Sequence, residues 1–168
     1  MAGHTLSLIP VIALLAVAGG SVAEAGCNDL PQENVDWRSC NLSGIDFPEA
    51  VLAGGNLRGA ALSNANLRNA DFSRIDGYRV RFVESDLTGA TFDGAKLTGA
   101  RFDRADLSGA SMRHVDVRDT KFLFADLTGV DFTGAVLRDV DFTGATLSGA
   151  TWTDGAKVCA EGSRGICR

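Results

Sequence analysis

Large apolar residues recur at every fifth position through most of the chain. The series starts at Leu42 and runs without an insertion to Trp152, which gives 23 positions. Only Gly77 in this series is not a large apolar residue. A spacing of five fits neither the 3.6-residue period of an amphipathic helix nor the two-residue alternation of a strand. It predicts a short strand-like step followed by a turn, repeated along the chain.

The residues around each apolar centre repeat as well. The position two residues before the centre is alanine in 13 of the 23 units, and the position two residues after it is glycine in 11 units. A low-complexity linker has no reason to hold bulky residues in phase over such a length. We therefore expect a repeat structure in which the large centres fill the interior and the small residues let the chain bend close to the axis.

The repeated unit, as in Ala65-Asn66-Leu67-Arg68-Asn69 and Ala105-Asp106-Leu107-Ser108-Gly109, resembles the pentapeptide repeat family. The resemblance covers residues 40–154 and implies an all-β fold, a right-handed quadrilateral β-helix with four repeats per coil. The repeats then make about 5.75 coils, a rod roughly 25–30 Å long at the strand spacing of about 4.8 Å. We assign residues 1–25 to a signal peptide, 26–39 to an N-terminal cap and 155–168 to a disulfide-closed C-terminal cap.

Four repeats per coil place every fourth centre in one column. The aromatic centres then separate into two columns on opposite faces, which supports the four-repeat frame because facing aromatic columns keep the volume of each layer nearly constant. The first column is Leu42, Leu62, Phe82, Phe102, Phe122 and Phe142, and the third is Leu52, Phe72, Phe92, Met112, Phe132 and Trp152. Gly77 leaves its own layer underfilled. We interpret it as a tolerated gap or a local bulge, with a functional hinge as the alternative.

The N-terminus predicts export. Leu6 to Ala18 is an apolar run of 13 residues, too short to span a bilayer of roughly 30 Å. Ala23-Glu24-Ala25 follows as a cleavage site, although no lysine or arginine precedes the run. We expect cleavage near Ala25, a periplasmic or secreted protein and no transmembrane span in the mature chain. Lipidation at Cys27 is the alternative, but Glu24 occupies a position where a lipoprotein signal has an aliphatic residue.

The four cysteines lie outside the regular repeats or at their first unit. An even number in an exported chain indicates disulfides. The rod implied by the family resemblance separates its ends by some 25 Å, whereas bridged Cα atoms lie within about 7 Å. We therefore predict the pairs Cys27–Cys40 and Cys159–Cys167. No C-x-x-C motif supports zinc, and we expect no metal site.

Composition and motifs give little support to catalysis. Charged residues make up 22% of the chain and the net charge is −5, which gives no case for a nucleic-acid binder. His114 is the single histidine after residue 25, and no specific Ser-His-Asp or Cys-His arrangement can be proposed around it. No phosphate-binding or dinucleotide-binding glycine motif is present. We expect no catalytic residues, no cofactor and no enzyme activity.

The four-repeat frame also places the outward residues. Arg81, Arg101 and Lys121 form a basic column, and the adjacent face carries the acidic column Asp46, Asn66, Asp86, Asp106 and Asp126. The two columns could simply compensate one another. Phe124 is the only phenylalanine of nine outside a centre, and an exposed aromatic among cations is a reasonable contact site. The candidate binding face therefore consists of Arg81, Val83, Arg101, Lys121, Leu123 and Phe124.

Three functions follow from these features. The first is a non-enzymatic exported scaffold that presents a rigid β-helical face to an unknown protein or cell-envelope partner, in an oligomeric state that the sequence leaves open. The second comes from the family, some members of which resemble B-DNA and bind DNA gyrase. It needs a strongly acidic surface and a cytosolic location. The third is a Ca²⁺ binder or a carboxylate-based polysaccharide enzyme that uses the acidic column, but no insertion is present to build a groove.

Overall fold

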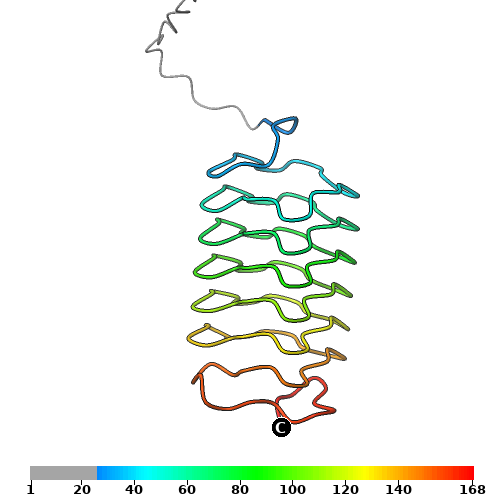
Figure 1. The fold of residues 1–168 in the computed structure, drawn as a ribbon, viewed down its shortest axis with the longest axis vertical. Coiled ribbons are helices and arrows are strands. Elements are labelled where there is room, and N and C mark those ends of the chain that lie inside the picture. Colours follow the sequence, from blue (N-terminus) through cyan, green and yellow to red (C-terminus); the bar gives the residue numbers. More distant parts are fainter. Residues whose placement is uncertain (1–25) are drawn as a thin grey trace, which may run out of the picture.

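The chain folds into a rod of stacked coils, shown in the computed structural model in Figure 1, which describes residues 26–168. The predicted signal peptide, residues 1–25, lies outside the described residues. Parallel bridges join residues 20 positions apart, as in Asp36–Asn56, Arg81–Arg101 and Asp131–Thr151. Twenty residues correspond to four five-residue units, so the predicted quadrilateral β-helix is confirmed.

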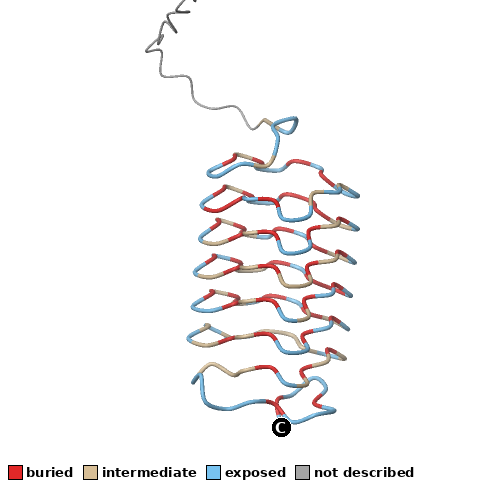
Figure 2. Cartoon of the chain, viewed as in Figure 1, coloured by how far each residue is buried: buried red, intermediate tan, exposed pale blue. Residues whose placement is uncertain are grey.

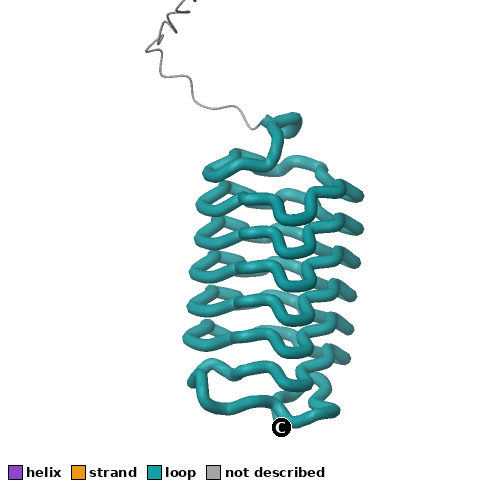
Figure 3. Tube along the Cα trace, viewed as in Figure 1, coloured by secondary structure: helices purple, strands orange, loops and turns teal. Residues whose placement is uncertain are grey.

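The regular structure consists of single-residue bridges. Between residues 26 and 168 there is no helix and no continuous strand, because each unit contributes one bridge residue and then turns (Figure 3). In every coil before the last, the N–H of each centre donates to a carbonyl of the next coil, as from Leu67 to Asp86 over 2.8 Å. The N–H of Asp86 donates back to Ala65 over 2.9 Å. Hydrogen bonds along the rod thus satisfy the backbone on both sides of a coil.

The core is one continuous cluster of buried side chains contributed by all coils. Buried positions recur in every coil along the rod (Figure 2). Rings within one column stack, with centroids 5.1 Å apart for Phe82 and Phe102 and 4.8 Å apart for Phe72 and Phe92. Rings from the two opposite columns meet edge to face, as Phe82 and Phe92 do at 5.7 Å. The predicted separation of the aromatic centres into two facing columns is confirmed.

The layer at Gly77 is filled, so the prediction of an underfilled layer is wrong. A Cβ atom on Gly77 would lie 2.7 Å from Leu97 Cδ2, 3.1 Å from Val80 Cγ1 and 3.3 Å from Ile75 Cδ1. Ile75 and Val80 stand where most units have alanine. The larger neighbours therefore occupy the volume that the missing side chain at Gly77 leaves.

Each turn has a corner residue, two positions after the centre, in the left-handed conformation. At one corner of adjacent coils, Asn69 has a φ of 55° and Gly89 a φ of 68°. The aspartate or asparagine before the centre supports the turn, because its side chain accepts the N–H two residues on. Asp106 Oδ1 accepts from the Ser108 N–H at 2.9 Å, and Asp126 Oδ1 from the Thr128 N–H at 2.9 Å. The left-handed corner explains the glycine or asparagine two positions after the centre, and the accepted N–H explains the aspartate or asparagine before it.

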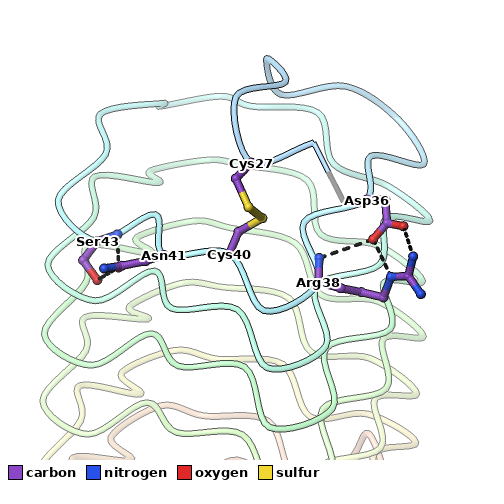
Figure 4. The surroundings of a disulfide bond; sticks show 6 residues. All are labelled: Cys27, Asp36, Arg38, Cys40, Asn41 and Ser43. Atoms are coloured by element: carbon purple, nitrogen blue, oxygen red, sulfur yellow. Dashed lines mark hydrogen bonds and ion pairs between the residues drawn. A yellow bond between two sulfur atoms is a disulfide. The ribbon is translucent and has the colours of Figure 1, made fainter. Parts of the chain in front are cut away.

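The N-terminal end begins its regular coils inside the segment assigned to the cap. Asp36 already forms a coil bridge, and Trp37 takes a fully buried centre position. Cys27 is bonded to Cys40, with Cα atoms 5.4 Å apart (Figure 4). This pairing is the one predicted, and it ties the segment before the first coil to that coil.

At the C-terminal end the chain reverses over the last coil (Figure 1). Thr151 and Val158 form an antiparallel bridge, as do Thr146 and Arg164. The second predicted disulfide, Cys159–Cys167, is also present, with Cα atoms 4.9 Å apart. The reversed segment supplies the hydrogen-bond partners that a further coil would otherwise provide.

Candidate interaction face

One face of the rod carries all six residues of the candidate binding face. The bridges Arg81–Arg101 and Arg101–Lys121 place these three cations in register in successive coils. Beside them, one coil contributes Val83 and Glu84, the next Asp103 and Arg104, and the third Leu123 and Phe124. The predicted stacking of the basic residues is therefore what the structure shows.

A hollow of about 240 Å³ lies on this face. It is lined by Val83, Arg101, Asp103, Arg104, Leu123 and Phe124. Arg81 and Lys121 do not line the hollow; they lie in the coils on either side of Arg101. Four of the six predicted residues thus meet around one concave surface. Sequence reasoning missed Asp103 and Arg104, although both occupy the turn positions of the coil between Val83 and Leu123.

Phe124 has an unusual conformation for its residue type. It is a corner residue with a φ of 57°, and 62% of its surface is exposed. Bulky side chains are rare in the left-handed region, where glycine and asparagine are favoured. The ring lies against Gly144, the corner residue of the next coil, since a Cβ atom there would come within 2.6 Å of Phe124 Cε1. The packing of the core does not require an aromatic residue at this position.

Asp103 forms the polar floor of the hollow. The residue is 7% exposed, and its Oδ2 accepts a hydrogen bond from Arg101 Nε at 2.8 Å. Its Oδ1 is buried and has no hydrogen-bond partner among the residues that the structure describes. A buried carboxylate oxygen without a donor is uncommon, because its desolvation is then not compensated. The unpartnered Oδ1 atom is itself enclosed by the protein and does not face solvent.

The cations of this face differ in how they are neutralised. Arg101 pairs with Asp103, and Arg104 Nη1 lies 3.3 Å from Glu84 Oε1. Arg81 and Lys121 form no ion pair within residues 26–168. Below Lys121 the column ends at Asp141, whose pKa is lowered chiefly by a hydrogen bond from Thr143 and in part by Lys121. The face therefore offers two exposed cations outside the ion pairs of the described residues, of which Lys121 lies next to Asp141 in the column.

The aspartates of the acidic column on the adjacent face accept hydrogen bonds that stabilise the turns. Burial raises the pKa of Asp86, but hydrogen bonds from Thr88 and Arg68 outweigh burial and lower it. Asp46 accepts a hydrogen bond from Asn66 Nδ2 at 2.7 Å. Among the described residues no group of three histidine, cysteine or acidic side chains is arranged to hold a metal ion. These carboxylates thus have structural partners within the β-helix.

His114 occupies a corner, as its sequence position predicts. Its φ is 54°, and its imidazole lies against Gly134 of the next coil. A Cβ atom on Gly134 would fall within 2.6 Å of His114 Cε1. The contact is with a glycine backbone, the same arrangement that Phe124 makes with Gly144. Residues 26–168 contain no helix of the length and apolar character needed to span a membrane.

Comparison with known proteins identifies the repeats. The family described as Pentapeptide repeats matches residues 33–69, 56–94, 85–122 and 118–151. A comparison with curated proteins finds no significant match. The rod is similar to a crystal structure of a pentapeptide repeat protein from the thylakoid lumen of Arabidopsis thaliana, with 24% identity and a TM-score of 0.45. That alignment covers 77% of this chain and 84% of the plant protein.

Two other solved structures are similar. A pentapeptide repeat protein from the cyanobacterium Cyanothece 51142 has 25% identity and a TM-score of 0.38, over 68% of this chain and 88% of that one. QnrB1, a plasmid-mediated fluoroquinolone resistance protein, has 20% identity and a TM-score of 0.35, over 71% of this chain and 66% of QnrB1. With the family match spanning nearly all coils and with the 20-residue coil, the chain belongs to the pentapeptide repeat family.

Proposed function

We propose that this protein is a non-enzymatic, exported scaffold whose rigid β-helix presents the candidate binding face to a protein or cell-envelope partner. One observation carries the proposal: Phe124 is exposed, in a left-handed conformation, at the edge of a hollow flanked by cations. An exposed aromatic residue in a conformation disfavoured for it has a cost that the fold itself does not require. Contact with a partner would account for an aromatic residue at this position.

Export is supported by the two disulfides. Both bridges close segments at the ends of the rod, and every described cysteine is paired. Disulfides of this structural kind form and persist in oxidising compartments. Together with the apolar run and the cleavage motif before Cys27, they favour a location outside the cytoplasm.

The structural roles of the charged residues favour a scaffold over a gyrase-binding DNA mimic and over a Ca²⁺ binder or carboxylate-based enzyme. The aspartates of the acidic column support turns, as Asp106 does for Ser108, so their presence already has a structural explanation. A mimic of DNA needs a surface that is acidic throughout, whereas Arg81, Arg101 and Lys121 are stacked on one face. A gyrase-binding function therefore does not explain the face on which the unusual residues gather.

The proposal is tested in the cells that normally express the protein. Fractionation of a tagged chain should place it outside the cytoplasm with both disulfides formed. Affinity capture from that fraction should recover a partner with the wild type and lose it with the triple charge reversal of Arg81, Arg101 and Lys121. A cytosolic protein with free thiols would contradict export, and an identical set of partners for both chains would contradict the candidate binding face.

A further inference from the structure

We infer that the hollow binds an acidic peptide segment in which an apolar side chain is flanked by carboxylates. The inference rests on the proposed function and names the chemistry of the partner. The anchor side chain enters the hollow between Val83, Leu123 and Phe124, while its neighbouring carboxylates meet Arg81 and Lys121.

The apolar part of the hollow suits one side chain. Val83 and Leu123 are partly exposed, and Phe124 is largely exposed at the corner of the same coil as Leu123. The hollow of about 240 Å³ is concave, and its floor is the buried Asp103. An aromatic or aliphatic anchor that fills a desolvated pocket is the usual centre of a peptide-binding site. The dimensions therefore favour one inserted residue rather than a broad flat contact.

The cations of this face determine which residues should flank the anchor side chain in the bound peptide. Arg81 and Lys121 are exposed and free of ion pairs within the described chain, and Arg101 lies between them in the same column. Two coils separate Arg81 from Lys121, about 10 Å at the spacing of adjacent strands. An extended peptide covers this length in about three residues, so acidic residues on both sides of one anchor can reach both cations. The face is thus complementary to a short acidic segment.

The mixture of charges on this face favours a peptide over an anionic membrane. Glu84 and Asp103 interleave acidic charge among the cations of this face. Recognition of an anionic bilayer generally relies on clusters of about four to eight uninterrupted basic residues. The mixture of charges here fits a partner with discrete carboxylates.

A substitution at Phe124 can distinguish a role in binding from a role in folding. Asparagine occupies other corners in the same backbone conformation, as Asn64 does with a φ of 57°. Phe124→Asn should therefore fold and keep the stability of the rod, since asparagine tolerates the left-handed region better than phenylalanine. Its effect on binding then reports the loss of the aromatic wall of the hollow.

The test is a titration of the mature, oxidised protein with a fluorescent peptide that has one phenylalanine between aspartates. Two matched peptides carry alanine instead of phenylalanine, or lysines instead of aspartates. We expect the first peptide to bind and both controls to bind at least about tenfold more weakly. Phe124→Asn, and separately Arg81→Ala with Lys121→Ala, should each weaken the first peptide about tenfold. Val51→Ala, which alters an exposed apolar residue on the opposite face, should leave binding unchanged.

Three results would overturn the inference: no binding of the acidic peptide, equal binding of its lysine counterpart, or binding only to vesicles of anionic phospholipid. Failure here is distinguishable from failure of the proposed function. A partner that is still captured through Phe124 in cells, while none of the peptides binds, rejects the acidic-peptide chemistry and keeps the interaction face.

Discussion

The ring of Phe124 lies against the backbone of Gly144, one coil further along the same corner. Both residues have a left-handed backbone, with φ of 57° at Phe124 and 73° at Gly144. The corner therefore combines an exposed aromatic ring with a neighbour that has no side chain. The Phe124 ring therefore occupies the space that a side chain at position 144 would need.

Gly144→Ala should destabilise the protein more than an equivalent change at an open corner. The new Cβ atom would meet the Phe124 ring at 2.6 Å from Cε1, in addition to the cost of a left-handed alanine. Gly129→Ala is the matched control, because its φ is 69° and nothing lies within 4 Å of its added Cβ atom. We expect a loss of about 1–2 kcal/mol at Gly129 and a larger loss at Gly144, measured by urea unfolding. Equal losses would show that the ring does not rest on Gly144.

The filled layer at Gly77 predicts that a larger residue at position 77 is tolerated only when Ile75 and Val80 become smaller. Gly77→Ala should cost about 1–3 kcal/mol, because the added atom would press on Leu97, Val80 and Ile75. Gly77→Leu alone should be more destabilising. Adding Ile75→Ala and Val80→Ala to Gly77→Leu recreates the common repeat and should recover most of that loss in thermal unfolding. If the triple variant is no more stable than Gly77→Leu, the flanking residues do not fill the layer.

The C-terminal disulfide should hold the reversed segment on the last coil. Replacing Cys159 and Cys167 by serine removes a bridge between residues eight positions apart, and we expect a loss of about 2–3 kcal/mol. Trypsin should then cleave faster after Lys157, whose Nζ donates to the carbonyl of Cys167 at 3.0 Å in the intact cap. The matched double serine variant of Cys27 and Cys40 should leave that cleavage rate unchanged. Faster cleavage in both variants would mean that the ends are not independent.

Acid should destabilise the rod through the aspartates that support its turns. A hydrogen bond from Arg118 is the main cause that lowers the pKa of Asp116 below its ordinary value of 3.8. A carboxyl with a lowered native pKa stabilises the fold above its unfolded pKa, and this contribution is lost as the pH falls through the native value. The unfolding temperature should be nearly constant from pH 7 to about 5 and fall below about pH 4.

Asp116→Asn provides the control for that acid dependence, because it keeps the shape of the side chain and removes its titration. The variant should be less stable than the wild type at neutral pH, and the difference should shrink as the pH falls. A difference that stays constant down to the acid transition would show that ionised Asp116 adds nothing to stability.

The coils were predictable because the five-residue repeat resembles the pentapeptide repeat family, which implies four units per coil. Centres such as Phe82 and Phe92 fall on opposite faces once four units make a coil, and their rings meet edge to face in the structure. The disulfide pairs followed from the length of the rod. By contrast, the filling of the Gly77 layer depends on how closely the side chains of Leu97, Val80 and Ile75 approach Gly77. Spacing along the chain does not contain that information.

The interaction face was predictable only in part, for a similar reason. The basic column and Phe124 were visible as departures from the repeat. Asp103 and Arg104 were not, because acidic and basic residues are common at turn positions throughout the chain. Asp103 is distinguished by its burial and its unpartnered Oδ1, and Arg104 by its place in the lining of the hollow. Contacts between coils, rather than residue type, distinguish them.

Site-specific photo-cross-linking in the native host tests the central claim most directly. A photoreactive phenylalanine analogue replaces Phe124 in one chain and Val51, an exposed residue on the opposite face, in another. We predict one discrete adduct from position 124, formed outside the cytoplasm and lost when Arg81 and Lys121 are changed to alanine, and no such adduct from position 51. The same adduct from both positions, or none from position 124 in the exported protein, would contradict the account.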